Sequence, residues 1–69
     1  MTEMNITKVG EDRYHVVIDD SFTTIDEDVN DSQLQGMLAA KKLAGTTCDE
    51  VLAFLDPQDI GYQTSIAYE

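Results

Sequence analysis

Cys48 and His15 are the one thiol and the one imidazole of the sequence, and they are the side chains best able to supply a nucleophile and a base. Cys48 is expected at the start of a helix, whose dipole lowers the pKa of a thiol, whereas Asp49 and Glu50 beside it raise that pKa. His15 is expected on a hairpin strand, with nothing to bring it to Cys48. We therefore predict a small, buried or half-buried structural cysteine and no catalytic pair.

Residues 26–30, Asp-Glu-Asp-Val-Asn, place oxygen-bearing side chains at alternate positions, as the start of an EF-hand calcium loop does. The later positions do not fit, because Asp31 stands where that loop needs glycine and Met37 where it needs glutamate. We expect a solvated acidic loop, with calcium-dependent ordering of residues 26–37 as one alternative. A single cysteine forms no intramolecular disulfide, and we predict neither a metal nor another cofactor.

Paired carboxylates such as Asp19-Asp20 would act as acid and base in a cleft, but a 69-residue domain has little room for a pocket of roughly 300 Å³ or more. Two helices flanking residues 45–47 would have the outline of a helix-turn-helix. The second of them, residues 48–55, carries two acids and no base, so the DNA backbone would repel it. We expect neither an enzyme nor a direct DNA binder.

Charge sets the class of partner. Fourteen acidic side chains face four basic ones, which gives a formal net charge of −10. Residues 14–40 hold six acids and residues 43–69 hold five, and neither stretch contains Lys or Arg. Such a surface is repelled by nucleic acid and anionic membranes and attracts basic partners. The hydrophobic content of 42% argues against a disordered acidic tail and predicts one compact domain over residues 1–69.

Period-two alternation predicts a β-hairpin over residues 4–20, turning at residues 10–12. One face of its second strand holds Tyr14, Val16 and Ile18, and the other holds Arg13, His15 and Val17. A short third strand is possible at residues 22–25, followed by a polar, turn-prone stretch at residues 26–31. Alternation over residues 62–68 predicts a closing strand antiparallel to the hairpin.

Two helices are expected between these strands. Ser32 and Gln35 fit a capping box and predict a helix through residue 44, with Lys41 and Lys42 near its end and Gly45 as its cap. A second capping box, at residues 47 and 50, begins a shorter helix that stops before residue 57, a proline. The predicted fold is α+β, in the order β-β-(β)-α-α-β, with a small antiparallel sheet packed against two helices.

The acids near the hairpin are the predicted contact surface for a partner. Six of them fall within residues 19–31 with no cation between them. On extended chain, alternate carboxylates lie about 6.8 Å apart and point the same way, so the array imitates a phosphate backbone. Hydroxyl groups of Ser21, Thr23 and Thr24, with Tyr62 or Tyr68, would add hydrogen bonds. The predicted binding residues are Asp19, Asp20, Asp26, Glu27, Asp28 and Asp31.

In size, charge and α+β build, the chain resembles the small acidic inhibitors that phages direct against host nucleic-acid-binding enzymes, such as anti-CRISPR proteins and other DNA mimics. This resemblance is one of overall character and rests on no motif, so it assigns no functional residue. It implies a non-enzymatic inhibitor that binds the basic surface of a nucleic-acid-binding protein. Since the first residues lack the features of a secretory signal, we expect a cytoplasmic protein, in the host cytoplasm if a phage encodes it.

The alternative is a protein-interaction module or small homodimer that uses apolar surface and an exposed edge of the closing strand. Phe22, Met37, Tyr62 and Tyr68 would then matter more than the acids, whose role would be solubility. A second group of acids, whose position the sequence does not fix, consists of Asp49, Glu50, Asp56 and Asp59.

Overall fold

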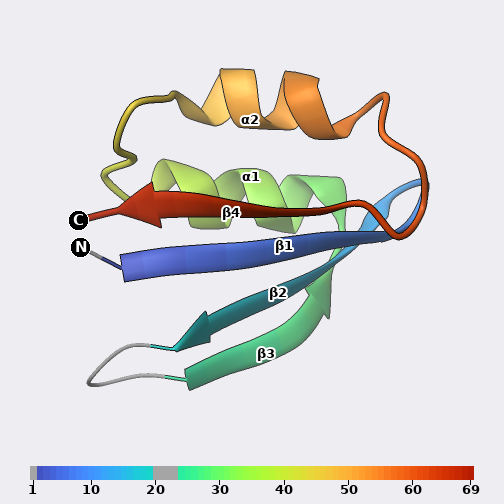
Figure 1. Cartoon of the computed structure of the whole chain (residues 1–69), viewed down its shortest axis with the longest axis horizontal. Coiled ribbons are helices and arrows are strands. Elements are labelled where there is room, and N and C mark those ends of the chain that lie inside the picture. Colours follow the sequence, from blue (N-terminus) through green and yellow to red (C-terminus); the bar gives the residue numbers. More distant parts are fainter. Residues whose placement is uncertain (1, 20–23) are drawn as a thin grey trace.

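A four-stranded antiparallel sheet and two helices form the structure, a computed structural model that describes residues 2–19 and 24–69 (Figure 1). The strands are β1 (Thr2–Gly10), β2 (Arg13–Asp19), β3 (Thr24–Val29) and β4 (Gln63–Tyr68), and the helices are α1 (Asp31–Ala39) and α2 (Cys48–Leu55). The predicted α+β class is confirmed, and the third strand completes the order β-β-β-α-α-β.

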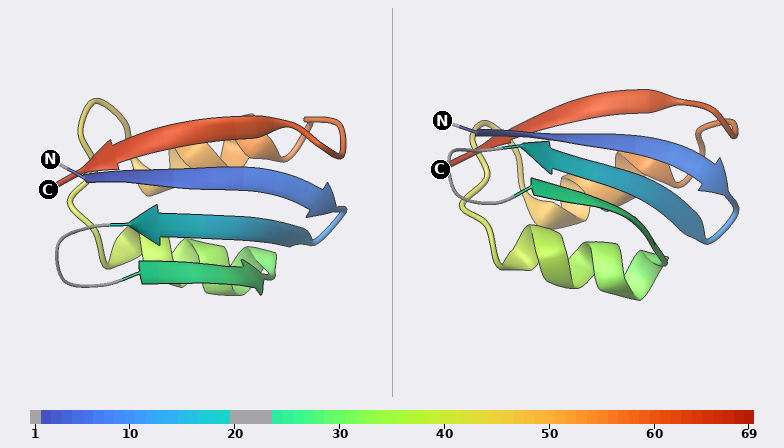
Figure 2. Two further views of the ribbon diagram at one scale, coloured as in Figure 1. Left: turned by 60° about the horizontal axis from the view of Figure 1, so that its bottom comes forward. Right: turned by 90° about the horizontal axis from the view of Figure 1, so that it is seen from below.

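The sheet has the strand order β3-β2-β1-β4, so β3 and β4 are its two edges. The closing strand β4 pairs antiparallel with β1, as predicted. Both helices lie on one face of the sheet, α1 under β2 and β3 and α2 nearer to β4 (Figure 2). Neither helix covers the opposite face of the sheet, and no other described segment lies over it; we call it the open face.

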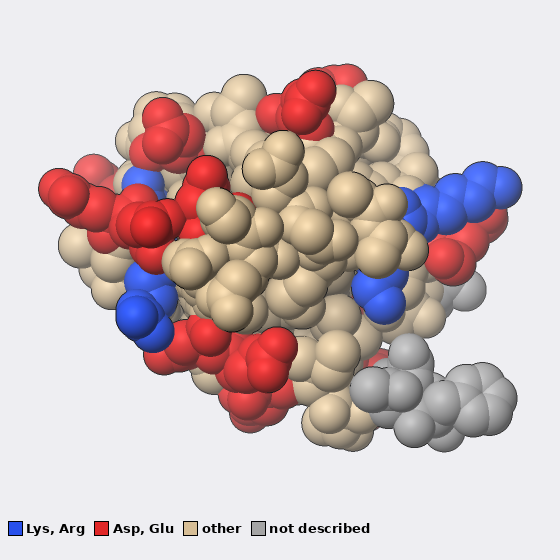
Figure 3. Space-filling model, turned by 180° about the vertical axis from the view of Figure 1, so that it is seen from behind, with Lys and Arg blue, Asp and Glu red and all other residues tan. Residues whose placement is uncertain are grey.

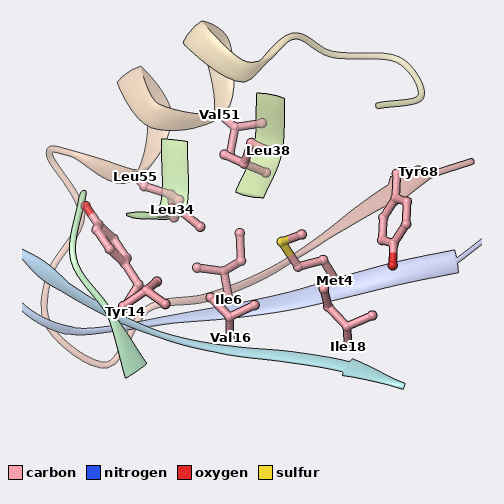
Figure 4. Close-up of a cluster of buried hydrophobic side chains, with 11 residues drawn as sticks. Met4, Ile6, Tyr14, Val16, Ile18, Leu34, Leu38, Val51, Leu55 and Tyr68 are labelled. Carbon is pink, nitrogen blue, oxygen red and sulfur yellow. The ribbon is translucent and has the colours of Figure 1, made fainter. Parts of the chain in front are cut away.

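Alternation along the strands decides which side chains reach the helices. The predicted division of β2 is confirmed, because Tyr14, Val16 and Ile18 are buried and the intervening side chains are not. Leucine and valine side chains of α1 and α2 pack down on this buried face and close the core (Figure 4). The buried apolar residues are Met4, Ile6, Tyr14, Val16, Ile18, Val29, Leu34, Leu38, Val51, Leu55 and Tyr68.

The third strand is where the sequence analysis was most in error. The stretch 26–31 was expected to form a turn-prone loop, but β3 continues through Asp28 to Val29 and pairs with β2 along its whole length. Tyr14 lies opposite Val29 and Ile18 opposite Ile25, so buried apolar side chains hold the strand in register. Acidic side chains have low strand propensity, and tertiary pairing overrides it here.

The start of α1 was predicted two residues too late. Asn30 is the cap: its Oδ1 accepts a hydrogen bond from the Gln33 amide at 2.8 Å, and the Gln33 Oε1 accepts one from the Asn30 amide at 2.9 Å. The reciprocal capping box is therefore present, but it uses Asn30 and Gln33 instead of Ser32 and Gln35. Asparagine caps as well as serine does, and Asn30 follows directly on β3.

The end of α1 was predicted too late as well, since the helix stops at Ala39. Lys41 and Lys42 consequently lie beyond its last turn, and Gly45, whose φ is +78°, serves the following loop and not the helix cap. The second helix begins and ends as predicted, because Thr47 Oγ1 accepts a hydrogen bond from the Glu50 amide and α2 ends at Leu55. The predicted capping box is only half formed, since the Glu50 Oε1 accepts from the Thr47 hydroxyl and not from its amide. No helix among the described residues is long and apolar enough to cross a membrane.

Candidate functional site

The acids of β3 lie along one border of the sheet. Asp26 and Asp28 point to the open face of the sheet, whereas Glu27 between them points to the face that carries α1, and all three are exposed. Alternation of this kind follows directly from strand geometry, which sets Asp26 and Asp28 about 6.8 Å apart on the same side. The edge strand therefore carries negative charge on both of its faces.

His15 lies between the two aspartates on the open face. Its Nδ1 is 2.6 Å from Asp28 Oδ1 and its Nε2 is 2.8 Å from Asp26 Oδ1. Asp28 is directly opposite His15 in the β2–β3 ladder, and Asp26 is the diagonal neighbour two residues along β3. Because both ring nitrogens face carboxylate oxygens, the doubly protonated imidazolium is the form that satisfies both contacts.

We expect the pKa of His15 to lie above its ordinary value of about 6.5. The hydrogen bond to Asp28 is the largest cause; partial desolvation opposes it, and the charge of Asp26 adds to the rise. Since the folded state has the higher pKa, this contribution to stability is full below the unfolded pKa and is lost as the pH rises through the folded pKa. An NMR titration of the imidazole measures the shift.

The matched variants for this titration are Asp28→Asn and Asp26→Asn. Each removes one carboxylate from His15, and Asp28→Asn should lower the pKa of His15 by the larger amount. A folded-state pKa no higher than that of the unfolded chain would contradict the arrangement described here.

Three further acids, Asp12, Asp31 and Asp56, lie at the end of the molecule where β1 turns into β2. The Asp31 amide donates a hydrogen bond to Asp12 Oδ1 at 2.9 Å, which joins the hairpin turn to the start of α1. Burial raises the pKa of Tyr14, and the negative charges of Asp31, Asp56 and Asp12 raise it further. We call Asp12, Asp31 and Asp56 the acidic end. Figure 3 shows acidic side chains gathered at this end and again along the border that carries β3, with Lys or Arg side chains between the two groups.

Lys8 reaches the same end from inside the fold. It is 6% exposed, and its Nζ donates hydrogen bonds to the carbonyl oxygens of Asp56 at 2.7 Å and Leu55 at 3.4 Å. These carbonyls belong to the C-terminus of α2, where the helix dipole favours a cation. The ammonium group of Lys8 is thus committed to an internal contact and is largely withdrawn from the surface.

The six predicted contact residues do not form a single patch. Asp26, Glu27 and Asp28 follow one another along β3, and Asp31 continues the line into the acidic end. Asp19 lies at the other end of the β2–β3 ladder, opposite Thr24, and Asp20 falls outside the described residues. Asp26, Glu27, Asp28 and Asp31 therefore form a line along the border of the sheet, and Asp19 lies apart from it at the end of β2.

Sequence reasoning missed Asp12 and left Asp56 unplaced. They join the line because the hairpin turn lies beside the β3–α1 junction, an arrangement fixed by the pairing of Tyr14 with Val29. One sequence cue was passed over: Asn30 followed by Gln33 is a capping-box pattern, which starts α1 directly after β3. No cue in the sequence placed the end of α2 at the same point.

The expected help from tyrosine hydroxyls is not found. Tyr62 precedes β4 and Tyr68 ends it, and β4 is the sheet edge opposite β3. Tyr68 is also buried. Of the hydroxyl residues proposed in the sequence analysis, Ser21 and Thr23 lie outside the described residues, and Thr24 stands opposite Asp19.

Cys48 and His15 lie in separate parts of the fold. The Cys48 Sγ is 3.6 Å from the carbonyl oxygen of Gln35 on α1, and His15 contacts the aspartates of β3. Burial, followed by the charge of Asp49, raises the pKa of the Cys48 thiol, which makes it a poorer nucleophile at neutral pH. Among residues 2–19 and 24–69, no group of three or more His, Cys, Asp or Glu side chains is arranged to hold a metal ion.

Comparison of the chain with protein-family models, curated proteins and solved structures found no match.

Proposed function

We propose that this protein is a non-enzymatic inhibitor that binds the basic surface of a nucleic-acid-binding protein, in the manner of a phage-type DNA mimic such as an anti-CRISPR protein. The observation that carries the proposal is the line of carboxylates along β3, which continues through Asp31 into the acidic end. Within the described residues, the ionic partner of Asp26 and Asp28 is His15, and no Lys or Arg forms an ion pair with either.

Spacing supports the proposal. Carboxylates about 6.8 Å apart on a strand correspond to the axial rise of two steps of a duplex strand, which carries one phosphate charge per about 3.4 Å. A groove that neutralises phosphates with Lys and Arg would accept these carboxylates in their place. Long-range attraction between the two surfaces would make association fast and steeply dependent on salt.

His15 supports the proposal in a second way, because it fixes the positions of the two aspartates. A surface side chain that is already held in one rotamer loses less conformational entropy when a partner immobilises it. The histidine also offsets part of the local negative charge when it is protonated. The bound partner would therefore meet a rigid pair of carboxylates whose net charge depends on the state of one imidazole.

Displacement of fluorescent duplex DNA from purified nucleic-acid-binding proteins tests the proposal. The panel includes an RNA-guided nuclease and a nucleoid-associated protein, each measured at several salt concentrations. We expect the wild type to displace DNA from one member stoichiometrically at low salt. Asp26→Asn with Asp28→Asn should weaken this by about tenfold, if each exposed ion pair contributes about 0.7 kcal/mol.

The matched control is Asp49→Asn with Glu50→Gln, which changes the net charge by the same two units on α2. It should leave displacement within about twofold of the wild type. Equal losses of DNA displacement for the two double variants would mean that the total charge matters and the position of the acids on β3 does not. Binding that stays unchanged from low to high salt would exclude mimicry altogether.

A second candidate function, an interaction module using apolar surface, is favoured by one observation. Phe54 and Ile60 are 47% and 67% exposed, and the Phe54 ring contacts Tyr62 edge-on at a centroid distance of 5.5 Å. An exposed aromatic side chain that packs against a second ring is a feature of many protein contact surfaces. Under this hypothesis the Asp26→Asn, Asp28→Asn variant would bind as the wild type does, and Phe54→Ala would lose binding or self-association in sedimentation experiments.

A further inference from the structure

The geometry points to the free edge of β3 as a docking site for an extended, basic polypeptide segment, which we infer adds to the sheet as a fifth strand. This inference rests on the proposed function and deepens it, because it specifies the form of the partner's basic surface. It follows from the direction of the backbone groups of β3, from the state of the other sheet edge and from the charges that flank the free edge.

Two hydrogen bonds at one end of β1 fix the direction of its backbone groups. The Lys8 amide donates to the Tyr62 carbonyl at 2.8 Å, and the Gly61 amide donates to the Lys8 carbonyl at 2.6 Å. The backbone groups of Lys8 therefore point toward the β4 side. Since antiparallel strands alternate the direction of these groups, Thr7 and the other odd-numbered residues of β1 point toward β2.

The same alternation carries across the sheet to β3. Thr7 is opposite His15, so the amide and carbonyl of His15 point toward β1. Those of the next residue, Val16, point toward β3. Val16 is opposite Glu27, which is consequently a hydrogen-bonded position of β3. The intervening residues, Asp26 and Asp28, aim their amide and carbonyl groups away from the sheet, as does Thr24.

Nothing in the described part of the chain lies beyond this edge. Figure 2 shows β3 as the outer border of the sheet, with α1 underneath it and no segment alongside it. A row of outward amides and carbonyls at strand spacing is the feature to which an extended peptide adds by main-chain hydrogen bonds.

The other edge of the sheet is partly closed. Leu43 forms a bridge with Tyr68, and the Ala44 amide donates to the Ala67 carbonyl at 3.0 Å, so the segment after α1 covers the end of β4. The remaining open part of β4, around Ser65, carries no charge. A basic segment is therefore directed to β3 and not to β4.

Charge selects the occupant of the β3 edge. Asp26 and Asp28 flank it on the open face of the sheet and Glu27 on the helix face, so a fifth strand with Lys or Arg on either face meets an opposite charge. A second copy of this chain would place carboxylates against carboxylates, which destabilises the pairing. The edge thus disfavours self-association and favours a basic strand.

Two synthetic peptides of equal charge provide the probe. One is an eight-residue alternation of Arg and Thr, which can form a strand, and the other is its N-methylated form, which cannot extend a ladder because it lacks the backbone amide hydrogens. We expect the Arg-Thr peptide to bind about tenfold or more tightly, because it alone gains main-chain hydrogen bonds. In amide hydrogen exchange it should protect Thr24, Asp26 and Asp28, whose amides point outward, and leave Ile25 and Glu27 nearly unchanged.

A matched pair of variants separates backbone from charge. Asp26→Pro and Asp26→Asn both remove the same carboxylate, but only proline removes the outward amide, at a position where an edge strand tolerates it. Asp26→Pro should reduce binding of the Arg-Thr peptide toward the level of its N-methylated form, whereas Asp26→Asn should retain the preference for the unmethylated peptide. The circular-dichroism spectrum of each variant reports whether it folds. If Asp26→Pro does not fold, the hydrogen-exchange pattern of the wild type with the Arg-Thr peptide tests strand addition instead.

Equal affinity for the two peptides, without new protection at Asp26 and Asp28, would overturn strand addition and leave the acidic contact of the proposed function standing. No binding of either peptide at low salt would also overturn it. The displacement assay with duplex DNA reports on the proposed function by itself, so the two failures are distinguishable.

Discussion

Leu34→Ala is expected to lower the free energy of unfolding by about 2–5 kcal/mol. Leu34 is fully buried between α1 and the sheet, where the truncation removes apolar contact and leaves a cavity (Figure 4). A domain of this length has a total stability of roughly 3–5 kcal/mol, so the loss should be a large fraction of the whole and should lower the urea midpoint markedly. Urea denaturation followed by circular dichroism measures the loss.

The control for this experiment is Ile60→Ala. Ile60 is also a large aliphatic residue, but it is 67% exposed, and its truncation should change the stability by no more than about 0.5 kcal/mol. If Leu34→Ala cost less than about 1 kcal/mol, the packing of α1 on the sheet described here would be wrong. The packing of α1 also bears on the proposed function, because α1 contacts β3, the strand that carries the proposed binding residues.

Lys8→Met is expected to lower the free energy of unfolding by about 1.5–3 kcal/mol, the usual contribution of hydrogen bonds that involve a charged group. Methionine keeps most of the apolar stem of Lys8 and removes its ammonium group. The carbonyl oxygens of Leu55 and Asp56 then lose their donor at the negative end of the α2 dipole. The acidic end also loses its nearest buried cation, so the loss should be smaller at high salt, where repulsion among the acids is screened.

Lys42→Met is the matched control, since it also converts lysine to methionine. Lys42 is 82% exposed at its side chain and lies 3.7 Å from Glu69, an exposed ion pair that contributes little to stability. Thermal unfolding of both variants at low and high salt gives the comparison. Equal losses for the two lysines would show that Lys8 has no special role at the end of α2.

Most of the fold could be predicted from the sequence because its hydrophobic alternation is regular. Tyr14, Val16 and Ile18 identified the buried face of β2, and the cap at Thr47 with the proline at residue 57 bounded α2. These features act over a few residues, within the range where local geometry dominates. The α+β class and the antiparallel closing strand followed from them.

The errors fell where distant segments compete with local preference. Residues 40–44 continue a helical pattern, yet Leu43 leaves the helix to pair with Tyr68 at the edge of β4. The acidic residues of β3 disfavour a strand, yet the pairing of Ile25 with Ile18 and of Val29 with Tyr14 secures one. In both cases the tertiary pairing supplies hydrogen bonds and burial that local propensity does not contain.

The acidic character of this protein is determined by its sequence, since fourteen carboxylates against four cations make the surface negative in any fold. The tertiary structure decided which of those carboxylates act together. Strand pairing aligned Asp26 and Asp28 on either side of His15, and packing of the hairpin turn against α1 brought Asp12 to Asp31. Charge is a property of composition, whereas the relative position of charges distant in sequence depends on which segments pack together, and that is set by the core.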